Sequence, residues 1–126
     1  IAVVRDIFMS VGSVLTLPEK YMNAVTALSG SGPAFLALFV ESMTEAGIRM
    51  GLSKDNASEL AIQTFIGTSA LLDTGMTPDK LRAMVTSPGG TTAAGLKVFE
   101  EKGLMGLVAD ALLAAQKKAE ELGRRE

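Results

Sequence analysis

The sequence predicts an all-α fold, built as a helical bundle. Apolar residues recur every three or four positions along most of the chain, whereas the alternation typical of strands is missing. Each apolar stretch is bounded by glycine, proline, serine or threonine at positions where helices begin and end. A chain of 126 residues is long enough for one compact domain, and we expect that domain to span residues 1–126.

The apolar content of the chain predicts an oligomer. Hydrophobic residues make up 48% of the sequence and charged residues 21%, and the mean hydropathy is +0.31. These values exclude a disordered chain and are high for a monomer. We therefore expect surplus apolar surface to be covered by another subunit.

The first half of the chain contains one long predicted helix. Helical spacing over residues 3–11, followed by Gly12, predicts a helix end. Residues 18–22 are expected to form one short turn, and residues 29–33 a loop. The long helix then runs over residues 33–51 and is apolar on all sides for its first two turns. Such a helix must be buried on all sides, either centrally or at a subunit interface.

Four further helices are predicted, each with its own start or stop signal. Ser53 is a good N-cap, and the run Thr77-Pro78-Asp79 places a cap, a first-turn proline and an early carboxylate in order. The expected ranges are 53–73, 77–85, 91–102 and a last helix from Leu104 into the charged C-terminal tail, with turns at 73–76 and 87–90 and a stop at Gly103.

Two residue types that are missing restrict the chemistry. The chain has no cysteine, which excludes disulfides, thiolate metal sites and a cysteine nucleophile, and is compatible with the cytoplasm that we expect. It has no histidine, which removes the usual general base and the commonest zinc ligand. We expect no bound metal, and catalysis must use carboxylates, Lys, Tyr, hydroxyls, backbone amides or a cofactor.

Charge patterning argues against nucleic acid and membrane partners. The formal net charge is -2 and no basic patch is present, so DNA or RNA is not expected to bind. The longest charge-free stretch, residues 21–40, resembles a membrane span in composition. We expect the glycine-rich residues 29–33 to interrupt it, which predicts that no transmembrane helix is present.

The clearest candidate site is the charge-free loop before the helix predicted from Thr91. The first acidic residue of that helix is Glu100, so the positive end of the helix dipole has no compensating charge nearby. Free backbone amides would attract a monoanion such as a carboxylate, because no Lys or Arg lies close in sequence to balance a dianion. The candidate ligands are the hydroxyls and amides of Ser87, Thr91 and Thr92, with Gly89 and Gly90 allowing close approach.

Both candidate loops also have purely structural interpretations. Gly89 and Gly90 would then only form a tight turn, with Ser87 as its cap. Residues 29–33 match neither a Walker A loop nor GxGxxG, since Phe35 occupies the last glycine position. Thr26 either bonds a nearby carbonyl, as helical threonines usually do, or serves as a ligand beside that loop.

Three segments together resemble a known family. They are AVTALSGSGPAF at residues 24–35, AGIRMGL at 46–52 and VTSPGGTTAAGL at 85–96. This combination resembles the C-terminal, dimerisation domain of pyrroline-5-carboxylate reductase, and the resemblance covers nearly the whole chain.

The resemblance implies an activity and a role for each candidate residue. Members of this family reduce 1-pyrroline-5-carboxylate to L-proline with NADPH or NADH, and their helical C-terminal domains intertwine as homodimers, with a higher oligomer left open. By motif, Ser87, the Thr91 amide and Thr92 would hold the substrate carboxylate in the loop that contains Gly89 and Gly90. Thr26 would face the ring nitrogen at the catalytic position.

The chain also departs from the family pattern. Family members begin with a Rossmann domain, which these 126 residues do not supply, so we expect no dinucleotide binding by this chain alone. Residues 73–76 lie where relatives have a different loop, and we assign them no role. Two alternatives remain open: a non-catalytic helical oligomerisation module, and a sensor of small anions.

Overall fold

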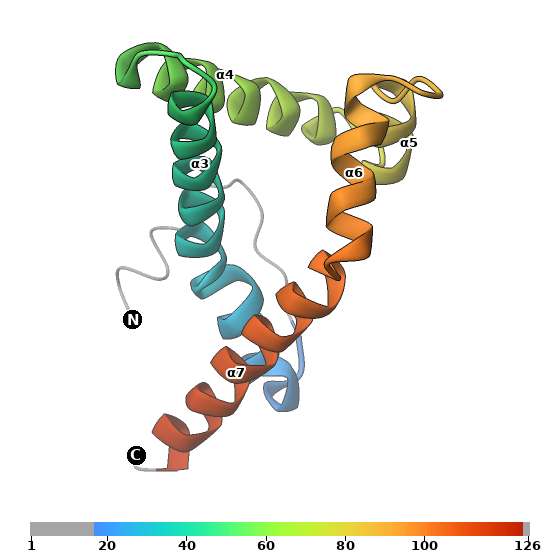
Figure 1. Ribbon diagram of the computed structural model, residues 1–126. Helices are drawn as coiled ribbons and strands as arrows, with labels where there is room; N and C mark the ends of the chain where they lie inside the picture. The colour runs from blue at the N-terminus through green and yellow to red at the C-terminus, as the bar shows by residue number, and fades with distance from the viewer. Residues whose placement is uncertain (1–16, 125–126) are drawn as a thin grey trace. The chain divides into compact units, whose positions relative to one another are not determined.

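The computed structural model describes residues 17–124, which form helices joined by short turns (Figure 1). No strand occurs within this described range, and the prediction of an all-α fold is confirmed. The helix end expected over residues 3–11 lies outside the described residues. The chain divides into two compact units: residues up to Leu36 together with those from Met105 onward, and residues Ala37 to Leu104.

The first unit begins with a helical stretch that changes its hydrogen-bond register twice. A 3₁₀ turn, η1 (Glu19–Tyr21), leads into the short α2 (Met22–Val25) and then into a π-helix, η2 (Thr26–Gly30). The short turn predicted at residues 18–22 is therefore present, but the helix continues beyond it. The same unit contains nearly all of α7 (Leu104–Arg124), the last predicted helix.

The prediction of a loop at residues 29–33 is wrong. The Ser31 amide donates to the Thr26 carbonyl at 3.0 Å, five residues back, which is the π-helical pattern. Ser31, itself in a helical conformation, alone separates η2 from α3 (Gly32–Arg49). Pro33 explains the change of register, because proline lacks an amide proton and its ring clashes with the carbonyl four residues back in an α-helix.

Residues 29–33 were expected to interrupt the charge-free stretch at residues 21–40. The helix instead changes its hydrogen-bond register there and continues. Residues Glu19–Arg49 form one helical stretch that is long and apolar enough to cross a membrane, judged by length and composition. The core helices of globular proteins pass the same test, so this finding by itself assigns no membrane role to the stretch.

The second unit contains most of α3, α4 (Lys54–Asp73), α5 (Pro78–Met84) and α6 (Thr91–Glu101). The predicted starts are confirmed: Ser53 Oγ accepts the Asn56 amide at 3.1 Å, and Pro78 occupies the first turn of α5. Thr77 makes no cap bond to the backbone, and its hydroxyl donates instead to the exposed Asp79 carboxylate. This hydrogen bond lowers the pKa of Asp79.

Helices α3 and α4 meet through a tight turn and two small residues. The Leu52 amide donates to the Gly47 carbonyl and the Gly51 amide to the Ile48 carbonyl, each at 3.0 Å. Gly51 has a φ of +105°, so these bonds form a Schellman motif with glycine at its left-handed position. Gly47 is buried, and a Cβ placed on it would lie 2.9 Å from Ala57 Cβ.

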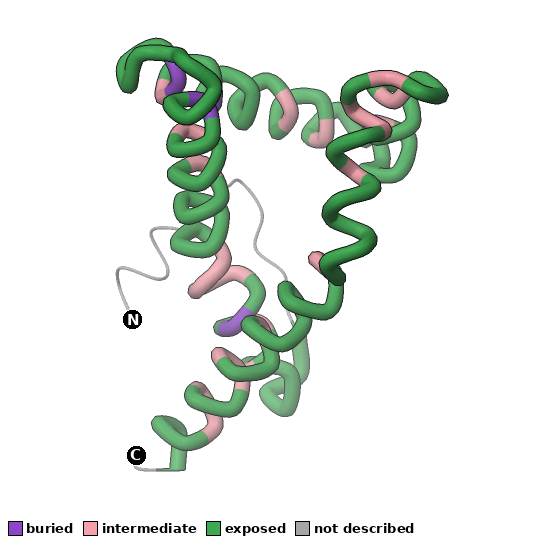
Figure 2. The backbone as a smooth tube through the Cα atoms, in the orientation of Figure 1, coloured by how far each residue is buried: buried purple, intermediate pink, exposed green. Residues whose placement is uncertain are grey.

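Few apolar side chains are buried within residues 17–124. In this range the buried hydrophobic residues are Ala27, Ala57 and Ala61, and most of the tube in Figure 2 is exposed. By contrast, Leu36 and Leu38 on α3 are 51% and 61% exposed, and their neighbours Phe35 and Phe39 are also exposed. These four positions cover about 160° of the helix circumference, and the exposed Ala34 and Ala37 lie on the remaining sides. The start of α3 thus presents apolar side chains in all directions, as the sequence predicts for an interface helix.

Candidate anion-binding site

The candidate loop is a tight turn between α5 and α6. Its closing bond runs from the Gly90 amide to the Ser87 carbonyl at 3.0 Å. Gly89 has a φ of +73°, in the left-handed region where a side chain would be strained. The tight turn predicted from the sequence is therefore present, and the strain confines position 89 largely to glycine.

Gly90 is required for a different reason. A Cβ on Gly90 would lie 2.5 Å from Ser87 Oγ and 3.2 Å from the Ser87 carbonyl oxygen. The Ser87 hydroxyl thus lies directly over the N-cap position of α6. This close packing places the Ser87 hydroxyl beside Gly90, the N-cap residue of α6.

The first turn of α6 has unpaired backbone donors. The Ala94 amide begins the intrahelical bonding by donating to the Gly90 carbonyl at 3.2 Å, so the amides of Thr91, Thr92 and Ala93 precede it without acceptors in the helix. Gly90 offers no side-chain cap, and the first turn contains no acidic residue. By comparison, α4 is capped by Ser53. The start of α6 can therefore accept an anion from outside the chain.

Many hydroxyl groups of the described residues are already bonded to the backbone of their own helix or turn. These hydroxyls donate to backbone carbonyls three or four residues back, and belong to Ser42, Thr44, Thr64, Ser69, Thr74 and Thr86. The hydroxyls of Ser87, Thr91 and Thr92 have no such bond among the described residues, and neither do those of Ser58 and Thr68 on α4. The hydroxyls in the loop are thus available for a ligand.

Thr26 lies at the first residue of η2, and its side chain is exposed. Its carbonyl accepts the Ser31 amide, but no bond from its hydroxyl is recorded among the described residues. Thr26 belongs to the first unit and the loop at residues 87–92 to the second. The structure therefore brings the loop residues together, and leaves their position relative to Thr26 undefined.

Sequence reasoning missed two features of these segments. One is the Ala93 amide, which is a donor equivalent to those of Thr91 and Thr92; the predicted helix start would have identified it. The other is the π-helix at Thr26. Its signal in the sequence was Pro33, whose ring is incompatible with a regular α-helical turn across Ser29.

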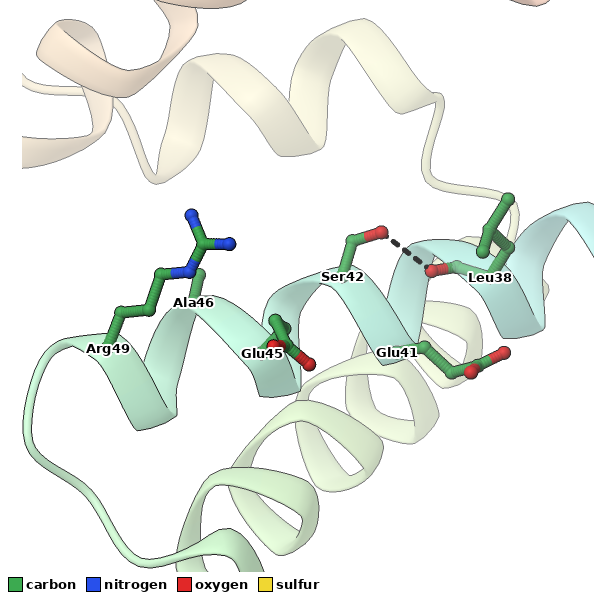
Figure 3. A pocket seen from close by; sticks show the side chains of 6 residues that line it. All are labelled: Leu38, Glu41, Ser42, Glu45, Ala46 and Arg49. Atoms are coloured by element: carbon green, nitrogen blue, oxygen red, sulfur yellow. Dashed lines mark hydrogen bonds between the residues drawn. The ribbon is translucent and has the colours of Figure 1, made fainter.

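A shallow pocket occurs on one face of α3, away from the loop in sequence (Figure 3). It is lined by Leu38, Glu41, Ser42, Glu45, Ala46 and Arg49. The Ser42 hydroxyl donates to the Leu38 carbonyl at 2.9 Å, so this hydroxyl is already used. Because all of its lining residues come from a single helix, the pocket is a surface groove without converging donors.

Comparison with known proteins identifies the family. The family model for pyrroline-5-carboxylate reductase dimerisation matches residues 19–122. The chain is 42% identical over 126 residues to a pyrroline-5-carboxylate reductase of Synechocystis, which covers 99% of this chain and 47% of that protein. It is 44% identical over 137 residues to the enzyme of Mycobacterium tuberculosis, covering 94% of this chain and 46% of that protein.

Solved structures give the same result. A Plasmodium falciparum pyrroline carboxylate reductase with NADP bound superposes with a TM-score of 0.84 at 37% identity, over 97% of this chain and 47% of that one. A pyrroline-5-carboxylate reductase from Coxiella burnetii gives a TM-score of 0.85 at 40% identity, over 96% and 46%. The chain thus spans about half the length of the relatives it matches. The resemblance drawn from the loop motifs is confirmed: the chain belongs to the pyrroline-5-carboxylate reductase dimerisation domain family.

Proposed function

We propose that this chain is the dimerisation and substrate-binding part of a reductase that converts 1-pyrroline-5-carboxylate to L-proline. The family match and the relatives' names support the reaction. The main support for the binding site is the uncapped start of α6. Among the described residues, three amides and three hydroxyls there have no partner that would compete with a ligand. We place the protein in the cytoplasm, with which the cysteine-free composition is compatible.

The substrate carboxylate binds at the α6 N-terminus in this proposal. The Ser87 and Thr92 hydroxyls and the Thr91 amide donate to its oxygens, and Gly89 and Gly90 keep the approach free of side chains. Neutral donors and a helix dipole suit a single negative charge. This preference favours the carboxylate of a small imino acid over a phosphate dianion.

Thr26 acts at the ring nitrogen in this proposal. Its unengaged hydroxyl would hydrogen-bond the nitrogen and hold the ring in place, while the nicotinamide supplies the hydride. This mechanism requires no histidine or cysteine, because the protein contributes only orientation and dipoles.

The cofactor of the intact enzyme is NADPH or NADH in this proposal, supported by the NADP-bound relative from Plasmodium falciparum. The described residues do not fit a dinucleotide: they contain no strand leading into a glycine-rich turn, and residues 26–30 are π-helical. The nicotinamide cofactor is therefore held mainly by protein outside this chain.

A titration with L-proline tests the proposed site. We expect amide shifts at residues 87–93 and at Thr26 when the labelled, assembled chain is titrated, with glycine and phosphate as controls. Stronger shifts with proline support a reductase site. Equal shifts with phosphate would indicate a small-anion sensor instead. No shift at high proline concentration would favour a non-catalytic oligomerisation module.

Thr92→Val should weaken L-proline binding by about 1–3 kcal/mol, because a hydrogen bond to a charged carboxylate is lost while the volume stays similar. This corresponds to about a five- to 150-fold higher dissociation constant. Thr91→Val is the matched control, since Thr91 contributes its backbone amide and the variant retains it. Equal losses in both variants, or none in Thr92→Val, would remove the Thr92 hydroxyl from the site.

A further inference from the structure

An aromatic pair joins helices α6 and α3 within the second unit. The Phe99 ring of α6 lies against the Phe39 ring of α3, with centroids 6.3 Å apart and ring planes at 50°. Both residues belong to the same unit.

The geometry of this pair is favourable. The centroid separation falls within the range of attractive aromatic contacts, and the tilt avoids the unfavourable face-to-face arrangement. Phe39 and Phe99 are 43% and 41% exposed, so each ring also has a free face. The contact therefore restrains α6 without burying it.

Phe99 lies about two turns beyond Thr91, on the helix that carries the proposed carboxylate donors. A helix is rigid along its axis, so a change of tilt at Phe99 moves the amides at the other end. Hydrogen bonds to a carboxylate depend steeply on distance and angle. The orientation of α6 thus controls how well these amides fit the ligand.

We propose that Phe39 and Phe99 are positioning residues: their contact fixes α6 against α3 and thereby aligns the amides of Thr91, Thr92 and Ala93. This inference rests on the proposed function, because it concerns the affinity of that same site. Neither ring touches the ligand in this arrangement. The pair acts through the helix that holds the donors.

Substitutions at both ends of the contact test the proposal. Phe39→Ala and Phe99→Ala should each raise the L-proline dissociation constant about two- to tenfold, as expected for loss of one aromatic pair. The double variant should lose no more than the weaker-binding single variant, because both changes remove the same contact. Phe99→Tyr should retain the affinity, since it keeps the ring.

Val98→Ala is the matched control, because Val98 is the adjacent exposed residue on α6 and forms no aromatic pair. Affinities are compared at protein concentrations where assembly is complete, so that a loss of oligomer does not enter the result. Additive losses in the double variant, or an equal loss in Val98→Ala, would overturn the positioning role.

A second readout separates this proposal from the proposed function. Without ligand, Phe99→Ala should shift the amide signals of Thr91, Thr92 and Ala93, whereas Val98→Ala should leave them in place. If the parent chain does not bind L-proline, the proposed function fails, and these signals still decide whether Phe99 orients the helix. Unchanged signals in Phe99→Ala would overturn the inference.

Discussion

Gly47→Val is expected to destabilise the protein by about 3 kcal/mol, because it adds a branched side chain where two helices touch. A Cβ alone on Gly47 would lie 2.9 Å from Ala57 Cβ and 3.7 Å from Ala57 Cα. These atoms are fixed to α4 and have no rotamer that moves them aside. The two helices must therefore separate, which disrupts the Schellman turn that joins them.

Equilibrium unfolding at a fixed protein concentration measures this effect, since unfolding of an oligomer depends on concentration. Gly67→Ala is the control: nothing lies within 4 Å of a Cβ at that position, so the better helix propensity of alanine should stabilise α4 by up to about 1 kcal/mol. Ala57→Gly should rescue Gly47→Ala, because one of the two clashing Cβ atoms is removed. An unaltered unfolding midpoint in Gly47→Val would contradict the described contact.

Helix boundaries were predictable because their signals are local. Ser53 and Pro78 act within one turn of their own positions, and the structure confirms the helix starts that they predicted. The π-helix at Thr26 was not predicted, because it results from a conflict between two segments. Residues before Ser31 continue a helix, whereas Pro33 excludes the α-helical register at that point.

The donors of the candidate site were also predictable, since an uncapped helix start and its glycines can be identified in the sequence. The contacts that shape the site were not. The approach of Ser87 Oγ to the Gly90 position depends on the exact path of the turn. The Phe39–Phe99 pair joins residues far apart in sequence, and helical periodicity gives no information on which side chains meet.

Leu36→Glu should dissociate the assembly formed through α3. Leu36 is 51% exposed in the isolated chain, and burying a leucine contributes about 1.5–3 kcal/mol. A carboxylate at that position would add the cost of desolvating an unpaired charge. In a symmetric dimer each penalty occurs twice, so we expect the dissociation constant to rise at least a hundredfold. Sedimentation or light scattering across a concentration series measures the change.

Helix α3 itself should survive this substitution, because glutamate is a good helix former. Circular dichroism at concentrations that retain the parent assembly checks this point. Ser42→Glu is the matched control, since it adds the same charge on the groove face that already contains Glu41 and Glu45. If Leu36→Glu assembles as the parent chain does, the apolar start of α3 is not the subunit interface. If Ser42→Glu dissociates the assembly equally, the subunit interface extends across the groove that contains Ser42. The apolar start of α3 would then not be sufficient to define the interface.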